Sequence, residues 1–192
     1  DSTALVDYSI ELDGILTELD SQIKELAGME FNTDSPKQMG EVLFEKLKIS
    51  AKAKKTKTGQ YATSEDILEK HQHDHPIIPL ILEYRKLRKL KSTYVDALPT
   101  YCDRNDARIH TNFMQTVTAT GRLSSNNPNL QNIPIRSEKG REIRRAFVPR
   151  DKEHKLMAVD YSQIELRIIA ALSGDPNMIQ AFRDGLDIHA AT

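Results

Sequence analysis

Residues 155–172 read KLMAVDYSQIELRIIAAL and carry the strongest structural signal in the chain. The apolar run 156–159 predicts a short buried strand that ends at Asp160. Ser162, with Glu165 three positions later, has the spacing of a capping box, which predicts a helix that begins at Ser162 and continues to Leu172. A carboxylate between a strand end and a helix N-terminus is a common metal-bound phosphate site, although spacing alone favours a plain helix cap.

The sequence before this stretch is mainly helical in pattern. Apolar residues recur at helical spacing over 5–26, and Gly28 is placed to end that helix. Ser35, followed by Pro36 and then Gln38, predicts the start of a second helix, with serine as the N-cap and glutamine completing a capping box. Two more helices are expected, over 64–70 and 77–98.

The sequence after Pro99 changes character. Residues 108–118 look strand-like, 120–134 predict an irregular loop rich in Gly, Ser, Asn and Pro, and a helix is expected near 177–182 after Asp175. Helices followed by mixed strands and helices predict an α+β protein, in which a helical domain precedes an α+β domain.

Composition narrows the class of protein. The chain has 192 residues, of which 39% are hydrophobic and 29% charged, and no apolar run is long enough for a membrane helix. Its single cysteine, Cys102, allows no internal disulfide and is typical of a reducing compartment, so we expect a cytoplasmic protein.

The net charge of -1 conceals a strong asymmetry. Residues 1–45 hold eleven of the 28 Asp and Glu and two of the 27 Lys and Arg, which leaves a surplus of eight positive charges in the rest. Residues 46–58 contain six lysines and no acidic residue, and they predict a flexible cationic loop. This distribution indicates an anionic partner for the later part of the chain, with nucleic acid the leading candidate.

Several motifs together resemble the family A DNA polymerases. Asp160-Tyr161-Ser162-Gln163-Ile164-Glu165-Leu166-Arg167 is similar to the family's first catalytic motif. Residues 118–125 (TATGRLSS) and 128–134 (PNLQNIP) resemble its primer-template segment, and 54–59 (KKTKTG) and 89–94 (KLKSTY) resemble its thumb. The motifs occur in the family's order over essentially the whole chain.

The resemblance implies a domain plan. Residues 1–100 would form a helical thumb with its basic tip near 46–58, residues 101–173 the first part of a palm with a mixed, incomplete sheet, and 174–192 the start of the fingers. The family's second metal-binding carboxylate and its triphosphate-binding helix do not occur in this sequence. We therefore expect the chain alone to have little catalytic activity.

The resemblance also implies the catalytic roles. Asp160 would bind two Mg²⁺ ions with help from the backbone carbonyl of Tyr161, as two-metal phosphoryl transfer requires. Gln163 would face the incoming deoxynucleoside triphosphate, Glu165 would exclude a ribose 2′ hydroxyl, and His189 would lie near the phosphates.

The expected contacts to primer-template DNA fall into two groups. Cations and hydroxyls on the thumb suit phosphates, and polar side chains after residue 120 suit the minor groove and the template strand. The first group is Lys52, Lys54, Lys55, Lys57, Arg85, Lys89, Ser92 and Thr93, and the second is Arg122, Asn129, Gln131 and Asn132. Without the resemblance, the amides would be interpreted as turn formers in a proline-containing loop.

Three functional hypotheses remain open at this point. The first is a DNA polymerase that acts in bacterial replication and repair, a nucleoid-associated monomer with no membrane partner. The second is a DNA-binding module without catalysis, and the third is an RNA polymerase of the same family, against which Glu165, Arg122 and Asn129 argue. The alternating histidines His71, His73 and His75 could suggest zinc, but with no cysteine partner a solvated helix end is preferred.

Overall fold

The computed structural model describes residues 1–51 and 53–186. It divides into two units, Asp1–Val148 and Pro149–Thr192. Helices predominate, and the strands form one small antiparallel sheet, which confirms the predicted α+β class. None of the described helices is long and apolar enough to span a bilayer.

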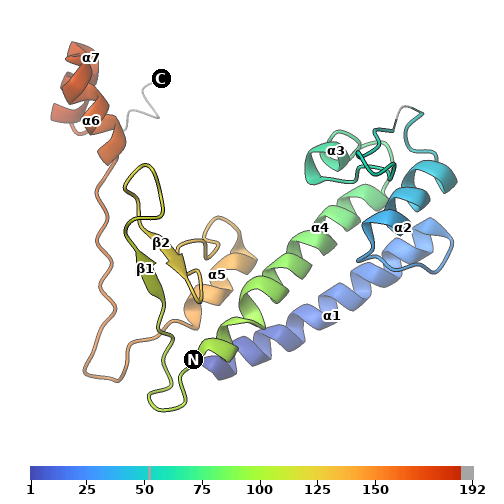
Figure 1. The fold of residues 1–192 in the computed structure, drawn as a ribbon, viewed down its shortest axis with the longest axis horizontal. Coiled ribbons are helices and arrows are strands. Elements are labelled where there is room, and N and C mark those ends of the chain that lie inside the picture. The colour runs from blue at the N-terminus through green and yellow to red at the C-terminus, as the bar shows by residue number, and fades with distance from the viewer. Residues whose placement is uncertain (52, 187–192) are drawn as a thin grey trace. The chain divides into compact units, whose positions relative to one another are not determined.

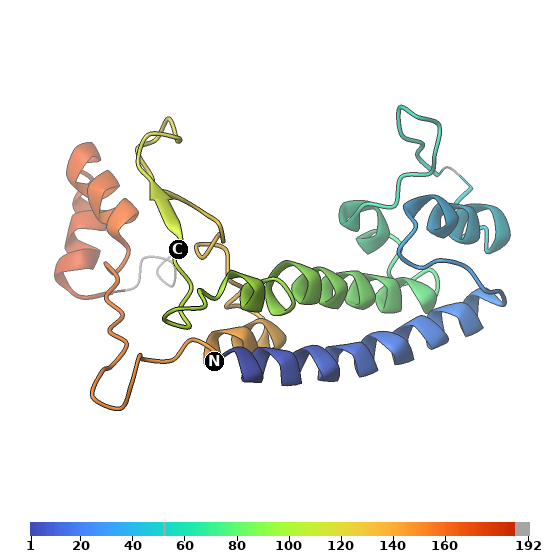
Figure 2. The same cartoon turned by 60° about the horizontal axis from the view of Figure 1, so that its bottom comes forward.

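Two long helices form the centre of the first unit. α1 (Ser2–Ala27) and α4 (Ile77–Leu90) lie side by side, and fully buried side chains such as Leu12, Ile23 and Leu87 belong to the core around them (Figures 1 and 2). α1 ends where predicted. Gly28 adopts φ 62°, and bonds from Gly28 N to Glu25 O and from Met29 N to Lys24 O form a Schellman motif.

The second predicted helix begins at the expected residue. α2 (Pro36–Glu41) is capped by Ser35, whose side chain accepts from Gln38 N at 3.4 Å, and it continues as the π-helix η1 (Val42–Lys46). The predicted capping box is only half formed, because Gln38 Oε1 accepts from Asn32 N at 2.7 Å. The Gln38 side chain therefore secures the chain that enters the helix.

The expected helices at 64–70 and 77–98 are both present in modified form. The first is α3 (Glu65–Glu69). The second begins as α4 at Ile77 but changes to the π-helix η2 (Lys91–Val95), and the short 3₁₀ helix η3 (Leu98–Tyr101) follows it.

The sheet is smaller than predicted and uses an unexpected strand. β1 (Asn112–Met114) pairs with β2 (Ser124–Asn126) in antiparallel register, with Phe113 opposite Ser125. The strand expected over 108–118 is thus reduced to three residues, and the prediction of an irregular loop over 120–134 is wrong at 124–126. α5 (Glu138–Arg145) follows, capped by Ser137.

The second unit contains two helices that pack on each other, α6 (Ile164–Ser173) and α7 (Pro176–Arg183). α7 begins as predicted, because the Asp175 side chain accepts from Asn177 N and Met178 N. The buried strand predicted at 155–160 is wrong, since these residues are exposed coil, with Met157 87% and Val159 82% exposed. A strand needs a ladder partner, and the described part of the chain offers none to these residues.

The start of α6 also differs from prediction. The helix begins after Gln163, which has a left-handed φ of 53°, and no side chain caps it. Ser162 is therefore not the N-cap. Its carbonyl oxygen accepts instead from Arg167 Nε at 2.8 Å, so the turn is held by a side chain from the next helical turn.

Candidate nucleic-acid interface and catalytic carboxylate

The later part of the cationic segment forms a hairpin where the sequence predicted a loop. Lys55 and Tyr61 form an antiparallel bridge, Thr56 N donates to Gln60 O at 2.7 Å, and Gly59 N donates to Thr56 O at 2.9 Å. Gly59 has φ 81°, which completes a three-residue hairpin turn of the kind that places glycine in a left-handed conformation. Residues 54–61 are hereafter called the lysine hairpin.

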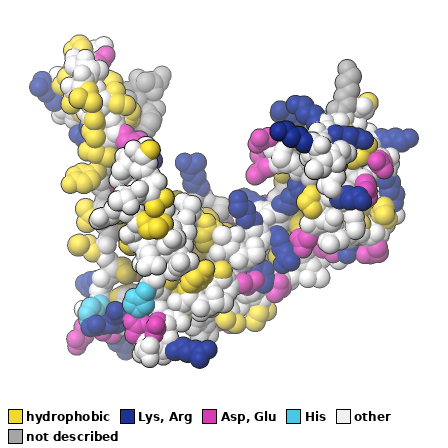
Figure 3. Space-filling model, viewed as in Figure 1, with side chains coloured by type: hydrophobic (Ala, Val, Ile, Leu, Met, Phe, Trp, Pro, Cys, Tyr) yellow, Lys and Arg dark blue, Asp and Glu magenta, His cyan; other side chains and the backbone are white. Residues whose placement is uncertain are grey.

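The lysine hairpin presents its cations to solvent. Lys54, Lys55 and Lys57 are exposed, and Figure 3 shows Lys and Arg side chains gathered over the region of α2 and α3. Lys55 Nζ lies 4.8 Å from the centroid of the Tyr61 ring, which in turn contacts Phe44 with centroids 5.3 Å apart. The hairpin is therefore anchored on η1 while its charges face outward. Lys52, a predicted phosphate contact, lies outside the described residues.

A glycine permits this anchoring. A Cβ placed on Gly40 would lie 2.7 Å from Tyr61 Cβ, closer than real contacts allow. α2 and the base of the lysine hairpin thus approach each other at a position that only glycine fills without a shift.

Cations on α4 and η2 divide into two kinds. Arg85 donates to the Thr63 carbonyl and, at 3.1 Å, to Thr63 Oγ1, and burial lowers the pKa of its guanidinium. Lys91 is 7% exposed and pairs with Asp96 at 2.8 Å and Asp13 at 3.3 Å. Both side chains therefore hold elements together, which limits the expected role of Arg85 at phosphates.

Three other predicted phosphate contacts remain available on the same surface. Lys89, Ser92 and Thr93 are all exposed, although Ser92 Oγ also donates to Lys89 O at 3.4 Å. Lys89 lines a hollow of about 410 Å³ together with Arg85 and Tyr94. These residues form a polar edge along the end of α4 and η2.

The amide-rich segment combines internal bonds with exposed groups. Gln131 Oε1 accepts from Ser125 N at 2.9 Å and its Nε2 donates to Leu123 O at 3.2 Å, so this side chain supports β2. Asn129 Oδ1 accepts from Gln131 N at 3.0 Å in an Asx turn. The turn-forming interpretation thus describes contacts that these two side chains make, while Asn132 remains exposed.

Tyr94 connects this segment to η2. Its hydroxyl donates to the carbonyl oxygen of Asn132 at 2.5 Å. A hollow of about 370 Å³ is lined by Thr93, Tyr94, Asn129 and Asn132, among others. The structure thereby brings together predicted contacts that are almost 40 residues apart in sequence.

Sequence analysis did not identify the hydroxyls of Ser125 and Thr111, whose hydrogen bonds support the amide-rich segment. Ser125 is 3% exposed, and its hydroxyl lies 2.7 Å from Thr111 Oγ1 and accepts from Leu130 N at 3.1 Å. Thr111 Oγ1 also donates to the carbonyls of Asn126 and Pro128. A Thr just before one short strand and a Ser within the other carry no distinctive signal in a single sequence, because the same residues are common in loops.

Arg122 lies on an exposed turn. Thr118 Oγ1 donates to the carbonyl oxygen of Arg122 at 2.6 Å, and Gly121 has φ 74°. The turn is thus closed through the backbone of Arg122, and the residue itself is exposed.

The residues of the predicted catalytic motif lie before and at the start of α6. Asp160 and Tyr161 are exposed, and Glu165 is exposed in the first helical turn. Gln163 occupies the left-handed position before the helix. The Arg167 guanidinium carbon lies 4.5 Å from the centroid of the Phe182 ring, which ties this start to α7. His189 lies outside the described residues.

The donor atoms expected at Mg²⁺ fit in kind. A carboxylate at Asp160 and a carbonyl at Tyr161 are the hard oxygen ligands that this ion prefers. Within 1–51 and 53–186, no group of three or more His, Cys, Asp or Glu is placed to hold a metal ion. These two residues alone would supply only part of the coordination shell that the sequence analysis expects.

The alternating histidines have other contacts. His71 Nδ1 lies 2.6 Å from Asp74 Oδ2, and His75 Nδ1 accepts from Ile77 N at 3.2 Å at the start of α4. Both contacts are typical of a helix end.

A solved structure shares this fold. The chain aligns with the POL domain of Pol1 from M. smegmatis, described as a complex with DNA primer-template and dNTP, at a TM-score of 0.85 and 44% identity, over 98% of this chain and 33% of that one. The fold is therefore that of part of a nucleic-acid polymerase domain. The chain belongs to DNA polymerase family A, which it matches over residues 2–192.

Curated relatives agree with this assignment. The chain is 57% identical over 178 residues to the DNA polymerase I of Synechocystis sp., covering 92% of this chain and 18% of that protein. It is 52% identical over 192 residues to the DNA polymerase I of Deinococcus radiodurans, covering 100% of this chain and 20% of that protein. The chain thus spans about a fifth of the length of the curated relatives it matches.

Proposed function

We propose that the chain is the DNA-gripping thumb and first palm segment of a DNA-templated DNA polymerase of bacterial replication and repair. Residues 1–100 serve as the thumb, 101–173 as the first part of the palm and 174–192 as the start of the fingers. Because such a protein acts on chromosomal DNA, we expect it in the bacterial cytoplasm with the nucleoid. We also propose that it acts as a monomer.

The lysine hairpin is the observation that carries the DNA-binding part of this proposal. Lys54, Lys55 and Lys57 project from a hairpin whose turn and base are fixed by hydrogen bonds and by Tyr61. No acidic residue between 46 and 58 offsets their charge. Cations of this kind contact phosphates irrespective of sequence, and they give affinity that decreases with salt.

The amide-rich segment supplies the second part of the DNA interface. Arg122 and Asn132 present donors to the minor groove, where correct base pairs offer acceptors in similar positions. Asn129 and Gln131 shape the turn that positions them, since both form internal bonds. Lys89, Ser92 and Thr93 extend the contacts along the DNA backbone.

Asp160 is the proposed catalytic carboxylate, and with the Tyr161 carbonyl it contributes ligands to two Mg²⁺ ions. When bound, such ions lower the pKa of the primer 3′ hydroxyl and neutralise charge on the triphosphate. Glu165, in the first turn of α6, occludes a ribose 2′ hydroxyl, and Gln163 and His189 contact the incoming deoxynucleotide. The solved relative, described as a complex with primer-template and dNTP, supports this choice of substrates.

Binding of the 192-residue chain to a labelled primer-template duplex tests the first half of the proposal. We expect saturable binding that weakens steeply with salt, and little primer extension when Mg²⁺ and deoxynucleotides are added. Absence of binding at low salt would refute the proposal. Clear extension that is lost in Asp160→Ala would instead refute the expectation that this chain lacks most of the catalytic apparatus.

A polymerase that includes this segment tests the second half. Asp160→Asn should abolish extension and leave primer-template affinity within about twofold, because the substitution preserves shape and removes a metal ligand. Extension at the unsubstituted rate would remove Asp160 from the mechanism.

Two alternatives follow from the same observations. The isolated chain acts as a non-catalytic DNA-binding module if it binds duplex DNA without synthesis. An RNA polymerase of the same family remains the other candidate, and Glu165 argues against it. Equal incorporation of ribonucleotides and deoxynucleotides by the intact enzyme would favour that alternative.

A further inference from the structure

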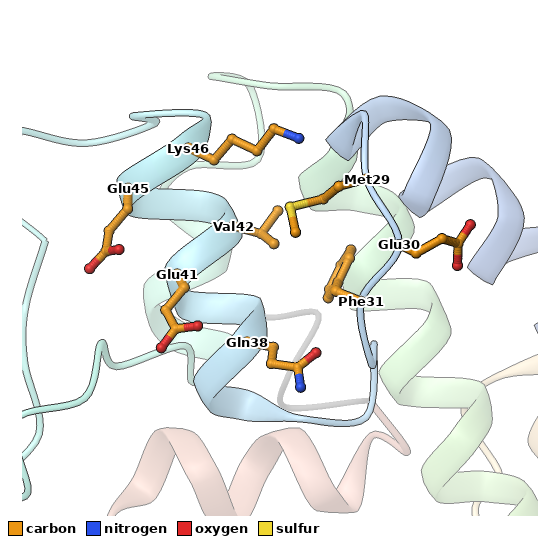
Figure 4. A pocket seen from close by; sticks show the side chains of 8 residues that line it. All are labelled: Met29, Glu30, Phe31, Gln38, Glu41, Val42, Glu45 and Lys46. Carbon is orange, nitrogen blue, oxygen red and sulfur yellow. The ribbon is translucent and has the colours of Figure 1, made fainter.

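A groove lies at the end of α1, beside α2 and η1. It separates residues 29–31 from the helical segment of α2 and η1 and has a volume of about 570 Å³ (Figure 4). Met29, Phe31 and Val42 supply its apolar surface, and Met29 is 43% exposed. Figure 4 shows these three side chains pointing toward one another between the two walls.

Carboxylates lie on both walls, and Figure 4 shows those of Glu30 and Glu45 pointing away from the three apolar side chains. Glu41 and Glu45 project from the helical wall and Glu30 from the opposite segment (Figure 4). The eight residues that line this feature, hereafter the acidic groove, are Met29, Glu30, Phe31, Gln38, Glu41, Val42, Glu45 and Lys46.

The nearby cations are already engaged. Lys46 Nζ donates to the Gly28 carbonyl at 2.8 Å, and Lys24 Nζ pairs with Asp20 at 2.8 Å and with Glu30 at 3.1 Å. Lys37 lies 4.0 Å from Glu41, at the limit for an ion pair, and both side chains are exposed. Glu45 has no ion pair with any described residue. Lys46 keeps its positive charge when it donates to a neutral carbonyl, so the three glutamates and one lysine that line the acidic groove leave a net formal charge of -2.

A second hollow continues the acidic groove. It has a volume of about 490 Å³, shares Met29 and Glu30 with the first, and extends over the end of α1 to Asp20 and Glu25. Two adjoining hollows that share an exposed methionine suit an extended or helical segment better than a compact ligand. Methionine adapts its shape to different apolar side chains, which is typical of binding surfaces.

The charge decides the kind of occupant. Residues 1–45 hold eleven acidic and two basic residues, and the carboxylates that line the acidic groove favour a cationic occupant over a phosphate. We propose that the acidic groove is a docking site for a basic segment of another protein, in which Arg or Lys side chains pair with Glu41 and Glu45 and an apolar side chain contacts Met29. This inference goes beyond the proposed function, because the expected DNA contacts lie on the lysine hairpin, α4, η2 and the amide-rich segment.

Three labelled peptides test the proposal on the whole chain. The first alternates arginine and leucine, the second has serine in place of leucine, and the third has glutamine in place of arginine. We expect the first to bind at least tenfold more tightly than either of the others. Equal binding of the arginine–serine peptide would show that charge alone is responsible and would overturn the proposal.

Variants locate the binding surface. An exposed ion pair contributes about 0.2–1 kcal/mol, so Glu41→Gln with Glu45→Gln should weaken binding of the arginine–leucine peptide about two- to thirtyfold. Asp7→Asn with Glu18→Gln removes the same charge from exposed positions on α1 and should leave the affinity unchanged. Similar losses in both double variants, with unchanged far-UV circular dichroism, would refute a specific groove.

Two further outcomes would identify another occupant. If duplex DNA displaces the peptide and the Glu41→Gln, Glu45→Gln variant tightens DNA binding, the surface belongs to the DNA interface. If sedimentation shows dimers that this variant abolishes, the occupant is the lysine hairpin of a second copy. Peptide binding that persists in Lys54→Ala, Lys55→Ala, Lys57→Ala supports the proposal and separates it from the DNA-binding function.

Discussion

Removing the charge of the lysine hairpin should change the salt dependence of DNA binding by a calculable amount. Lys54, Lys55 and Lys57 are exposed, and none is paired with a carboxylate among the residues that the structure describes. Each phosphate neutralised on duplex DNA contributes about 0.9 to the slope of log affinity against log salt. Three lost contacts should therefore flatten the slope by about 2.7. Between 50 and 200 mM salt, that difference corresponds to about 40-fold in affinity.

The assay is fluorescence anisotropy of a labelled primer-template duplex, titrated with the chain at several salt concentrations. The test variant is Lys54→Ala, Lys55→Ala, Lys57→Ala. The matched control is Lys37→Ala, Lys70→Ala, Lys152→Ala, which removes three exposed lysines outside the hairpin. The net charge falls by three in both variants, so a difference in their salt slopes reports direct contact with phosphates.

Single variants on α4 test individual phosphate contacts in the same assay. Lys89→Ala should reduce the slope by about 0.9, as for one full phosphate contact. Arg85→Ala should reduce it by less, because the Arg85 guanidinium already donates to Thr63. An unchanged slope in the hairpin variant, or an equal change in the control, would show that the hairpin is only a solvated surface.

Three further predictions concern the framework that carries the interface. Tyr94→Phe removes the hydrogen bond to the Asn132 carbonyl, which contributes about 0.5–1.5 kcal/mol. Primer-template affinity should therefore decrease about two- to tenfold with an unchanged salt slope. An unchanged affinity would mean that this hydrogen bond does not position the amide-rich segment. Leu12→Ala, at a fully buried position, should lower the free energy of unfolding in urea by about 2–5 kcal/mol, whereas Val6→Ala at a half-exposed position of the same helix should change it by less than about 0.5. Burial, assisted by Asp34, raises the pKa of Tyr84 from 10.0 to about 12. The contribution of the neutral Tyr84 hydroxyl to stability is therefore complete below pH 10 and is lost as pH rises toward 12. The free energy of unfolding in urea of Tyr84→Phe should lack that part of the alkaline decline, and identical pH dependence in the two proteins would contradict the raised pKa.

Local signals in the sequence predicted individual helix boundaries well. Gly28 ends α1 in a left-handed conformation, Ser35 and Pro36 start α2, and Asp175 starts α7. In each case the deciding interaction joins residues within a few positions of one another, so it forms whatever the rest of the chain does. The same is true of the tight turn at Gly59, although sequence analysis predicted a flexible loop there.

Predictions that needed distant partners were wrong. The apolar run 156–159 has strand-like composition, yet no described residue pairs with it, and it remains exposed. Ser124–Asn126 has a loop-like composition, yet it forms β2, because Thr111 and Gln131 supply bonds from either side. No local pattern in a single sequence shows which residues will pair with a strand or hydrogen-bond to it.

The candidate site shows the same division between sequence and structure. The motif 160–167, the lysine-rich segment and the amide-rich segment were identified through their resemblance to family A DNA polymerases, and the family is confirmed. The structure alone separated the cations of α4 and η2 into those held by internal partners, such as Arg85 and Lys91, and those exposed, such as Lys89. Helical spacing places a side chain on a face, but its partner is set by the elements that pack there, and those contacts arise only when the chain has folded.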